Sequence, residues 1–202
     1  MTESSPLGTT MVLLGAWHGV NPAMGWLFAV ALGLQEKRGA AVLRALPPLA
    51  LGHALAIGAA VLLAGAAGAA LGLTPVKWIV AVALLGFGIA RLVRATHPAW
   101  GGMRVGFGEL VLWSALVASA HGAGLMVVPW VLGTGMAPHG GAASNGLVAT
   151  TLHTAGYLAV TTLAAVVVYR WLGLRWLRTL WVNLDLVWGV ALIVTAVATP
   201  LL

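Results

Sequence analysis

Apolar residues run along this chain in stretches long enough to cross a lipid bilayer. A transmembrane helix needs about 20 consecutive apolar residues. Six stretches meet that length, at about 9–34, 43–71, 76–95, 107–134, 144–169 and 177–199. Short polar or glycine-rich connections separate them. The pattern therefore predicts an all-α integral membrane protein, with six transmembrane helices in a single domain that covers residues 1–202.

Basic residues mark one side of this predicted bundle. Nine of the ten lysines and arginines fall around the first, third and fifth connections, at Lys37, Arg38, Arg44, Arg91, Arg94, Arg104, Arg170, Arg175 and Arg178. Lys77 falls on the other side. Loops rich in Lys and Arg stay in the cytoplasm. We therefore expect a multi-pass protein of a bacterial-type inner (plasma) membrane, with both termini on the non-cytoplasmic side.

The two halves of the chain carry matching motifs. His18-Gly19 is followed by Pro22 in the first span, and His121-Gly122 is followed by Pro129 in the fourth. The second and fifth spans carry one histidine each, His53 and His153. Three spans repeated head to tail must be inverted, because three is odd, and many secondary transporters have this plan. The pattern predicts inverted repeats at about 9–95 and 107–199, with chance matching in a glycine-rich chain as the alternative.

Composition excludes several classes of function. The chain is 61% hydrophobic and only 7% charged, so almost no residues are left for a soluble domain. It has no cysteine, which excludes thiolate metal sites and thiol catalysis. It has no phosphate loop of the GxxxxGK[ST] type, so it is not its own ATPase. The net charge of +6 lies in short loops, which explains it without a nucleic-acid partner. We do not expect an enzyme.

Four histidines are predicted to form a site at the midplane. By helical rise, His18, His53, His121 and His153 each fall within about 7 Å of the centre of their span. Polar groups at that depth face the interior of a bundle rather than lipid. Neutral imidazoles bind transition metals, haem iron or protons. For any one of them, the alternative is a hydrogen bond to a neighbouring helix.

Two prolines and an amide are expected to shape the site. Pro22 cannot donate a backbone hydrogen bond, so Asn21-Pro22 is predicted to interrupt the first helix and to free the carbonyl of His18. The Asn21 amide oxygen would be a hard ligand. Pro129 follows the second His-Gly pair as Pro22 follows the first. An ordinary proline kink is the alternative.

Asp185 is the acidic residue predicted to lie within the sixth span. A carboxylate in hydrocarbon must be partnered or protonated, because an isolated charge there costs several kcal/mol. We expect it to take part in substrate binding and to balance the charge of a translocated cation. The alternative is a fixed salt bridge or hydrogen bond inside the bundle.

Two motifs resemble a known family. His18-x-x-Asn21-Pro22, followed by Leu51-Gly52-His53-Ala54-Leu55, is similar to the LysE superfamily of membrane transporters. The closer likeness is to its nickel/cobalt-transporter and urease-accessory-permease branch, with sulfite-exporter-like relatives. The resemblance implies a permease whose site includes His18, Asn21 and His53. The nickel branch places an Asp and a second His after its first His, where this chain has Asn21-Pro22, so the substrate does not carry over.

Three hypotheses of function follow. The first is a secondary transporter that moves a small solute, with a divalent transition-metal cation as the leading substrate and no resident cofactor. The second is a membrane redox subunit in which histidine pairs hold haem. The third is a non-transporting accessory or assembly protein. The expected partners are the lipid bilayer and the solute. A homo-oligomer is also considered, since GxxxG spacings such as Gly15-x-x-x-Gly19 permit close helix packing.

Overall fold

The computed structural model of the chain describes residues 6–93, 106–133, 142–172 and 184–201, and these are helical almost throughout, with no strand. The α-helices are α1 (Pro6–Val20), α2 (Trp26–Glu36), α3 (Gly39–Leu71), α4 (Leu73–Val93), α5 (Phe107–Ala120), α6 (Ala123–Gly133), α7 (Ala142–Val167) and α9 (Leu184–Ala198). Shorter turns are η1 (Pro22–Met24), the π-helical η2 (Val168–Leu172) and η3 (Thr199–Leu201). The all-α fold class is confirmed for these residues.

Membrane-spanning capacity is established for part of the predicted set. Among the residues that the structure describes, three helices are long and apolar enough to cross a membrane, at 39–71, 73–90 and 145–172. The pair α5 and α6 qualifies as a fourth when taken together, although it is bent by 64°. The predicted first span is divided into α1, η1 and α2, and part of the predicted sixth span lies outside the described residues. Arg94, Arg104, Arg175 and Arg178 also lie outside them.

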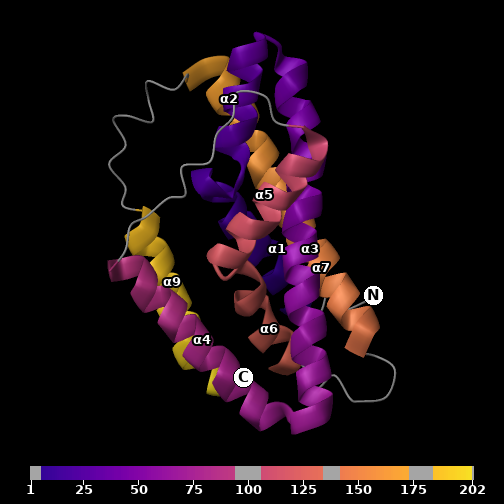
Figure 1. Cartoon of the computed structure of the whole chain (residues 1–202), viewed down its shortest axis with the longest axis vertical. Coiled ribbons are helices and arrows are strands. Elements are labelled where there is room, and N and C mark those ends of the chain that lie inside the picture. Colours follow the sequence, from indigo (N-terminus) through magenta and orange to yellow (C-terminus); the bar gives the residue numbers. More distant parts are fainter. Residues whose placement is uncertain (1–5, 94–105, 134–141, 173–183, 202) are drawn as a thin grey trace.

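Helix packing places α3 at the centre of the molecule. Figure 1 shows α3 running along most of its length, with α4 and α9 as a tilted pair along one side. α1 packs on α7, α5 packs on α3, and α4 packs on α9. Many large side chains on the outer faces remain exposed, among them Leu63 at 72% and Val82 at 66%. Exposed apolar surface on this scale is expected where lipid is the solvent.

Two hydrophobic clusters fill the interior, and the middle of α3 joins them. One cluster gathers side chains of α2, α3, α5 and α7 and includes Leu49. The other gathers side chains of α1, α3, α4, α6, α7 and α9 and includes Ile57. His53 lies four residues from each of these two, one helical turn in either direction. His53 therefore lies on α3 at the boundary between the two apolar clusters.

Glycines allow the closest helix contacts. A Cβ atom on Gly52 of α3 would overlap the carbonyl oxygen of Val111 in α5. A Cβ atom on Gly156 of α7 would likewise overlap the carbonyl oxygen of Val12 in α1. Small residues let helix backbones approach in this way where lipid gives no hydrophobic driving force. These contacts bring the histidine-bearing helices within side-chain reach of one another.

Candidate functional site

Three of the four predicted histidines meet inside the bundle. His18 of α1, His53 of α3 and His153 of α7 are each fully buried. Their ring centroids are 5.7 Å apart for His18 and His53, 4.8 Å for His18 and His153, and 5.4 Å for His53 and His153. We call these three residues the histidine cluster. His18 and His153 are 135 residues apart in the chain. The three rings nevertheless come together, as expected for histidines at similar depth in their spans.

Most nitrogen atoms of the histidine cluster have no hydrogen-bond partner. The Nδ1 atom of His18 lies 2.7 Å from the carbonyl oxygen of Leu14. Since a carbonyl can only accept, Nδ1 must carry the proton, and the Nε2 atom of a neutral His18 then presents a lone pair. That atom, and both ring nitrogens of His53 and of His153, are buried without a partner. Five polar atoms are therefore available to a ligand.

Ring orientation keeps these nitrogens from converging. The His53 ring is nearly parallel to that of His153, at 14°, and to that of Tyr157, at 9° and 3.9 Å. His18 meets both histidines edge-on, at 64°. Among the described residues, no group of three or more His, Cys, Asp or Glu side chains is arranged to hold a metal ion. Ligation by all three rings therefore requires a rotation about χ2, which is a soft torsion.

His121 is placed differently from the other three. It follows the last residue of α5, with its Nδ1 atom 2.8 Å from the carbonyl oxygen of Val117. Its ring centroid lies 6.1 Å from that of Trp188, which in turn lies 4.8 Å from the ring of His18. Neither nitrogen of His121 is among the unpartnered atoms. Trp188 thus connects it to the histidine cluster, because the indole ring contacts both His121 and His18.

The first helix break lies at Asn21-Pro22, and its carbonyl groups are occupied. Asn21 caps η1 by accepting a hydrogen bond from the backbone N–H of Ala23, at 3.0 Å, so its amide oxygen has a structural partner. The prediction that the His18 carbonyl is freed was wrong, because it accepts from the backbone N–H of Asn21 at 3.2 Å. A 3₁₀ turn re-pairs the group that the missing proline N–H would have left open.

Two aromatic donors complete this break. The indole Nε1–H of Trp26 donates to the carbonyl of Val20 at 3.0 Å. The hydroxyl of Tyr157 donates to the carbonyl of Met24 at 2.6 Å. In a bilayer, an interrupted helix is tolerated where neighbouring groups satisfy the backbone in this way.

The second helix break lies at His121-Gly122 and not at Pro129. Gly122 has φ of +69°, a value that glycine adopts without strain. Trp188 donates its indole N–H to the carbonyl of His121 at 2.9 Å. Pro129 lies inside α6, seven residues further on. The pairing of Pro22 with Pro129 as equivalent break residues does not hold, since glycine and not proline interrupts the second helix.

Asp185 lies in the first turn of α9, three residues before Trp188. Its side chain lies outside the described part of the structure, so its predicted role in substrate binding stays a prediction.

Two aromatic residues that lie beside the histidine cluster, Tyr157 and Trp188, were not predicted from the sequence. The signal for Tyr157 was its position four residues after His153, which places both on one face of α7.

No family model matches the chain, and no curated protein and no solved structure matches it. The likeness of residues 18–22 and 51–55 to the LysE superfamily therefore stays a prediction.

Proposed function

We propose that this protein is a multi-pass membrane permease that moves a small cation, with a transition-metal ion as the leading substrate, through the histidine cluster. The observation that carries the proposal is the set of five unpartnered nitrogens on three fully buried rings. A buried polar atom without a partner costs about 1–3 kcal/mol. Each neutral imidazole offers a cation one nitrogen lone pair, so a cation bound by all three rings removes part of that cost, and imidazole suits Zn, Cu, Fe and Ni.

The spacing of the rings supports a shared metal ligand. Three imidazoles bound tetrahedrally at about 2.0–2.1 Å from one metal ion have ring centroids about 5 Å apart. The measured separations of 4.8, 5.4 and 5.7 Å bracket that value. The backbone positions are therefore suited to a three-histidine site, and the required change is ring rotation, above all of His53. We assign Asp185, on the same helix as Trp188, the balancing of the substrate's charge.

An inverted repeat is supported by the pattern of helix packing. If α1, α3 and α4 correspond to α5, α7 and α9, then the contact of α1 with α7 corresponds to that of α5 with α3. The contact of α4 with α9 corresponds to itself. These three contacts are the most extensive among the described helices. Both His-Gly histidines also place Nδ1 within hydrogen-bond distance of the carbonyl four residues earlier.

The proposed topology has six crossings, with α1–α2 and α5–α6 as broken spans. Transporters built from inverted repeats bind their substrate near the midplane, beside interrupted helices, and rock one unit against the other. The histidine cluster combines one ring from the first break with one ring from each of two continuous helices. Both termini lie on the non-cytoplasmic side in this arrangement, as the positions of the basic residues favour.

Metal analysis of the purified protein tests the proposal. At about pH 7.5 we expect one first-row transition-metal ion per chain after loading, and transport of that ion into proteoliposomes. Protonated imidazole cannot ligate, so the affinity for metal should fall as the pH is lowered. A protein that takes up no metal at neutral pH would contradict the cation proposal. A metal affinity that does not change with pH would contradict the assignment to histidine.

Absorbance of the same sample tests the haem hypothesis. Axial ligation places two imidazoles on opposite faces of a flat macrocycle, whereas the three rings of the cluster contact one another directly. A Soret band in the purified protein would nevertheless replace the permease proposal. Co-purification with a larger complex, without transport in proteoliposomes, would favour the accessory role.

A further inference from the structure

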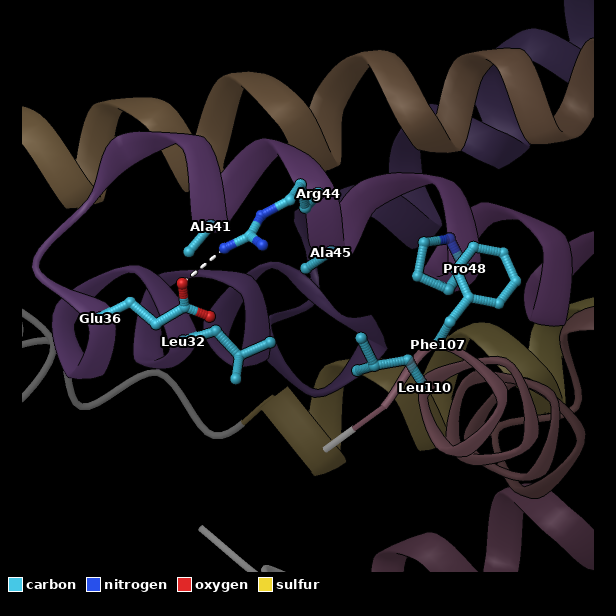
Figure 2. A pocket seen from close by; sticks show the side chains of 8 residues that line it. All are labelled: Leu32, Glu36, Ala41, Arg44, Ala45, Pro48, Phe107 and Leu110. Carbon is cyan, nitrogen blue, oxygen red and sulfur yellow. Dashed lines mark hydrogen bonds and ion pairs between the residues drawn. The ribbon is translucent and has the colours of Figure 1, made fainter. Parts of the chain in front are cut away.

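A pocket of about 320 Å³ lies between α2, α3 and the start of α5 (Figure 2). At its edge, Arg44 donates to the carboxylate of Glu36 at 2.5 Å. These side chains are 66% and 46% exposed, so the ion pair lies at the surface of the molecule. Most of the remaining wall is apolar, with Ala45, Pro48 and Leu110 among its residues. The pocket sits at the end of the bundle where α2 gives way to α3, the end that carries Lys37 and Arg38.

Continuous contacts lead from this pocket toward the histidine cluster. Ala45 and Leu110 belong to the same hydrophobic cluster as Leu49, which is fully buried one turn further along α3. The carbonyl of Leu49 accepts a hydrogen bond from the Ser114 hydroxyl of α5 at 2.6 Å. His53 follows one turn later. From Pro48 in the pocket wall to His53 the helical rise is about 7.5 Å.

Leu49 and Tyr157 both lie against Gly25, at the first helix break. A Cβ atom on Gly25 would lie 2.9 Å from the Tyr157 hydroxyl oxygen and 3.2 Å from the Leu49 side chain. Tyr157 is fully buried, stacks on His53 at 3.9 Å and donates to the carbonyl of Met24. Gly25 has φ of +142°, a conformation that favours glycine. One tyrosine therefore touches both the candidate site and the hinge of the broken helix.

We propose that this pocket is the entrance through which a hydrated cation reaches the histidine cluster, and that Leu49 and Tyr157 are its gate. This inference rests on the proposed permease function. Glu36 is the carboxylate that an entering cation meets first. Its ion pair with Arg44 is exposed and screened by solvent, so a cation can displace the arginine at little cost.

The stacking of His53 on Tyr157 couples the site to the gate. His53 must rotate to share a ligand with His18 and His153, and its ring cannot turn while Tyr157 stays packed against it. A shift of Tyr157 breaks its hydrogen bond to Met24 and releases the turn at Gly25. Occupation of the cluster and opening of the gate are thereby linked through one side chain.

Single cysteines provide the test, because the chain has none of its own. Ala45→Cys reports on the pocket and Leu49→Cys on the gate. Leu55→Cys, on an outer position at the middle of α3 that is 54% exposed, is the negative control, because the proposed topology places it in the lipid. In oriented vesicles, a charged thiol reagent applied from the side of the basic connections should label Ala45→Cys, label Leu49→Cys slowly, and leave Leu55→Cys unlabelled.

Tyr157→Phe then tests the gate itself. It keeps the aromatic ring but removes the hydroxyl donor, so labelling of Leu49→Cys should become about five- to tenfold faster, as expected for loss of one hydrogen bond. Tyr169→Phe is the matched control, since Tyr169 is the other tyrosine of the chain and packs beside Gly33 and Gly39. It should leave the rate unchanged. Metal content of each variant, measured in parallel, shows that the cluster remains folded.

Two outcomes would contradict this inference. An equal labelling rate of Leu49→Cys with and without Tyr157→Phe would contradict the gate, and labelling of Ala45→Cys from the opposite side alone would contradict the entrance. The parallel metal measurement separates this inference from the proposed function. Bound metal with unchanged labelling rates removes only the gate. Faster labelling in a protein that binds no metal removes the cation function and leaves the path in place.

Discussion

The two helix breaks of this molecule carry the same His-Gly pair and are held together in similar ways. At each one, the histidine Nδ1 lies close to the carbonyl four residues earlier, and an indole N–H caps a carbonyl of the break. Their histidines differ in surroundings. The Nε2 atom of His18 lies unpartnered among two further rings, whereas His121 stands against Trp188.

This difference shows that the hydrogen bonds within a helix break do not decide whether its histidine belongs to the histidine cluster. The motif fixes the tautomer and direction of its histidine through contacts within one helix turn. Whether the Nε2 atom then joins a site depends on which side chains the neighbouring helices bring. At the first break, α3 and α7 bring His53 and His153, and at the second break α9 brings Trp188. The histidine cluster therefore forms beside the first break and not beside the second.

Alanine at each motif histidine gives the largest expected contrast. His18→Ala removes a ligand of the cluster and should weaken metal binding at least about 100-fold, since loss of a mere outer-shell partner costs roughly 10–100-fold. His121→Ala should weaken it less than about threefold, because no unpartnered nitrogen is lost. Isothermal titration of both variants with the metal checks this. Equal losses would show that His121 is a ligand and that the two breaks serve one four-histidine site.

Close packing near the two breaks should be equally sensitive to a single methyl group. Gly52→Ala forces α3 away from α5, and Gly156→Ala forces α7 away from α1. Each should lower the free energy of unfolding by about 3 kcal/mol, at the upper end of the usual cost of overpacking, because the clash is with backbone. SDS unfolding titrations in detergent measure it.

Gly65→Ala is the control on the same helix as Gly52. Nothing lies within 4 Å of its added Cβ atom, so it should be neutral or stabilising by up to about 1 kcal/mol. A much larger loss for one of Gly52→Ala and Gly156→Ala than for the other would contradict the correspondence of the two halves.

Much of the histidine cluster could be predicted from the sequence, because its signals are single residues that an apolar helix rarely contains. His18, His53 and His153 were expected inside the bundle, since polar groups at midplane depth must avoid lipid. The break at Asn21-Pro22 was also expected, because proline removes a backbone donor. The expectation that Pro129 corresponds to Pro22 was wrong, since a proline within a buried helix is tolerated when neighbouring groups satisfy the freed backbone.

The rest of the site depends on how the helices are rotated against one another. Several helices here are apolar on all sides, so periodicity does not show which face turns inward. The stacking of His53 on Tyr157 and the contact of His121 with Trp188 arise from those rotations. No residue pattern along one helix encodes such a contact, which joins positions far apart in the chain.

Removing the indole donors compares the two breaks at a smaller scale. Trp26→Phe leaves the carbonyl of Val20 without its donor, and Trp188→Phe does the same for His121. Each should lower the free energy of unfolding by about 1 kcal/mol, as hydrogen bonds between membrane helices commonly contribute that much or less. Trp188→Phe should in addition change metal affinity, because its ring packs edge-on against His18. Unchanged affinity for Trp188→Phe would separate the second break from the site altogether.

The smallest effect is expected at the ion pair between α2 and α3. Glu36→Gln removes the charge that pairs with Arg44, and both side chains are largely exposed. Exposed pairs contribute about 0–1 kcal/mol, so the free energy of unfolding should change by less than about 1 kcal/mol. Uptake at low cation concentration should still slow, because the pocket loses its carboxylate while the histidine cluster is intact. A large loss of stability would instead show that the pair holds α2 against α3, and that the first break needs a clamp beyond its own hydrogen bonds.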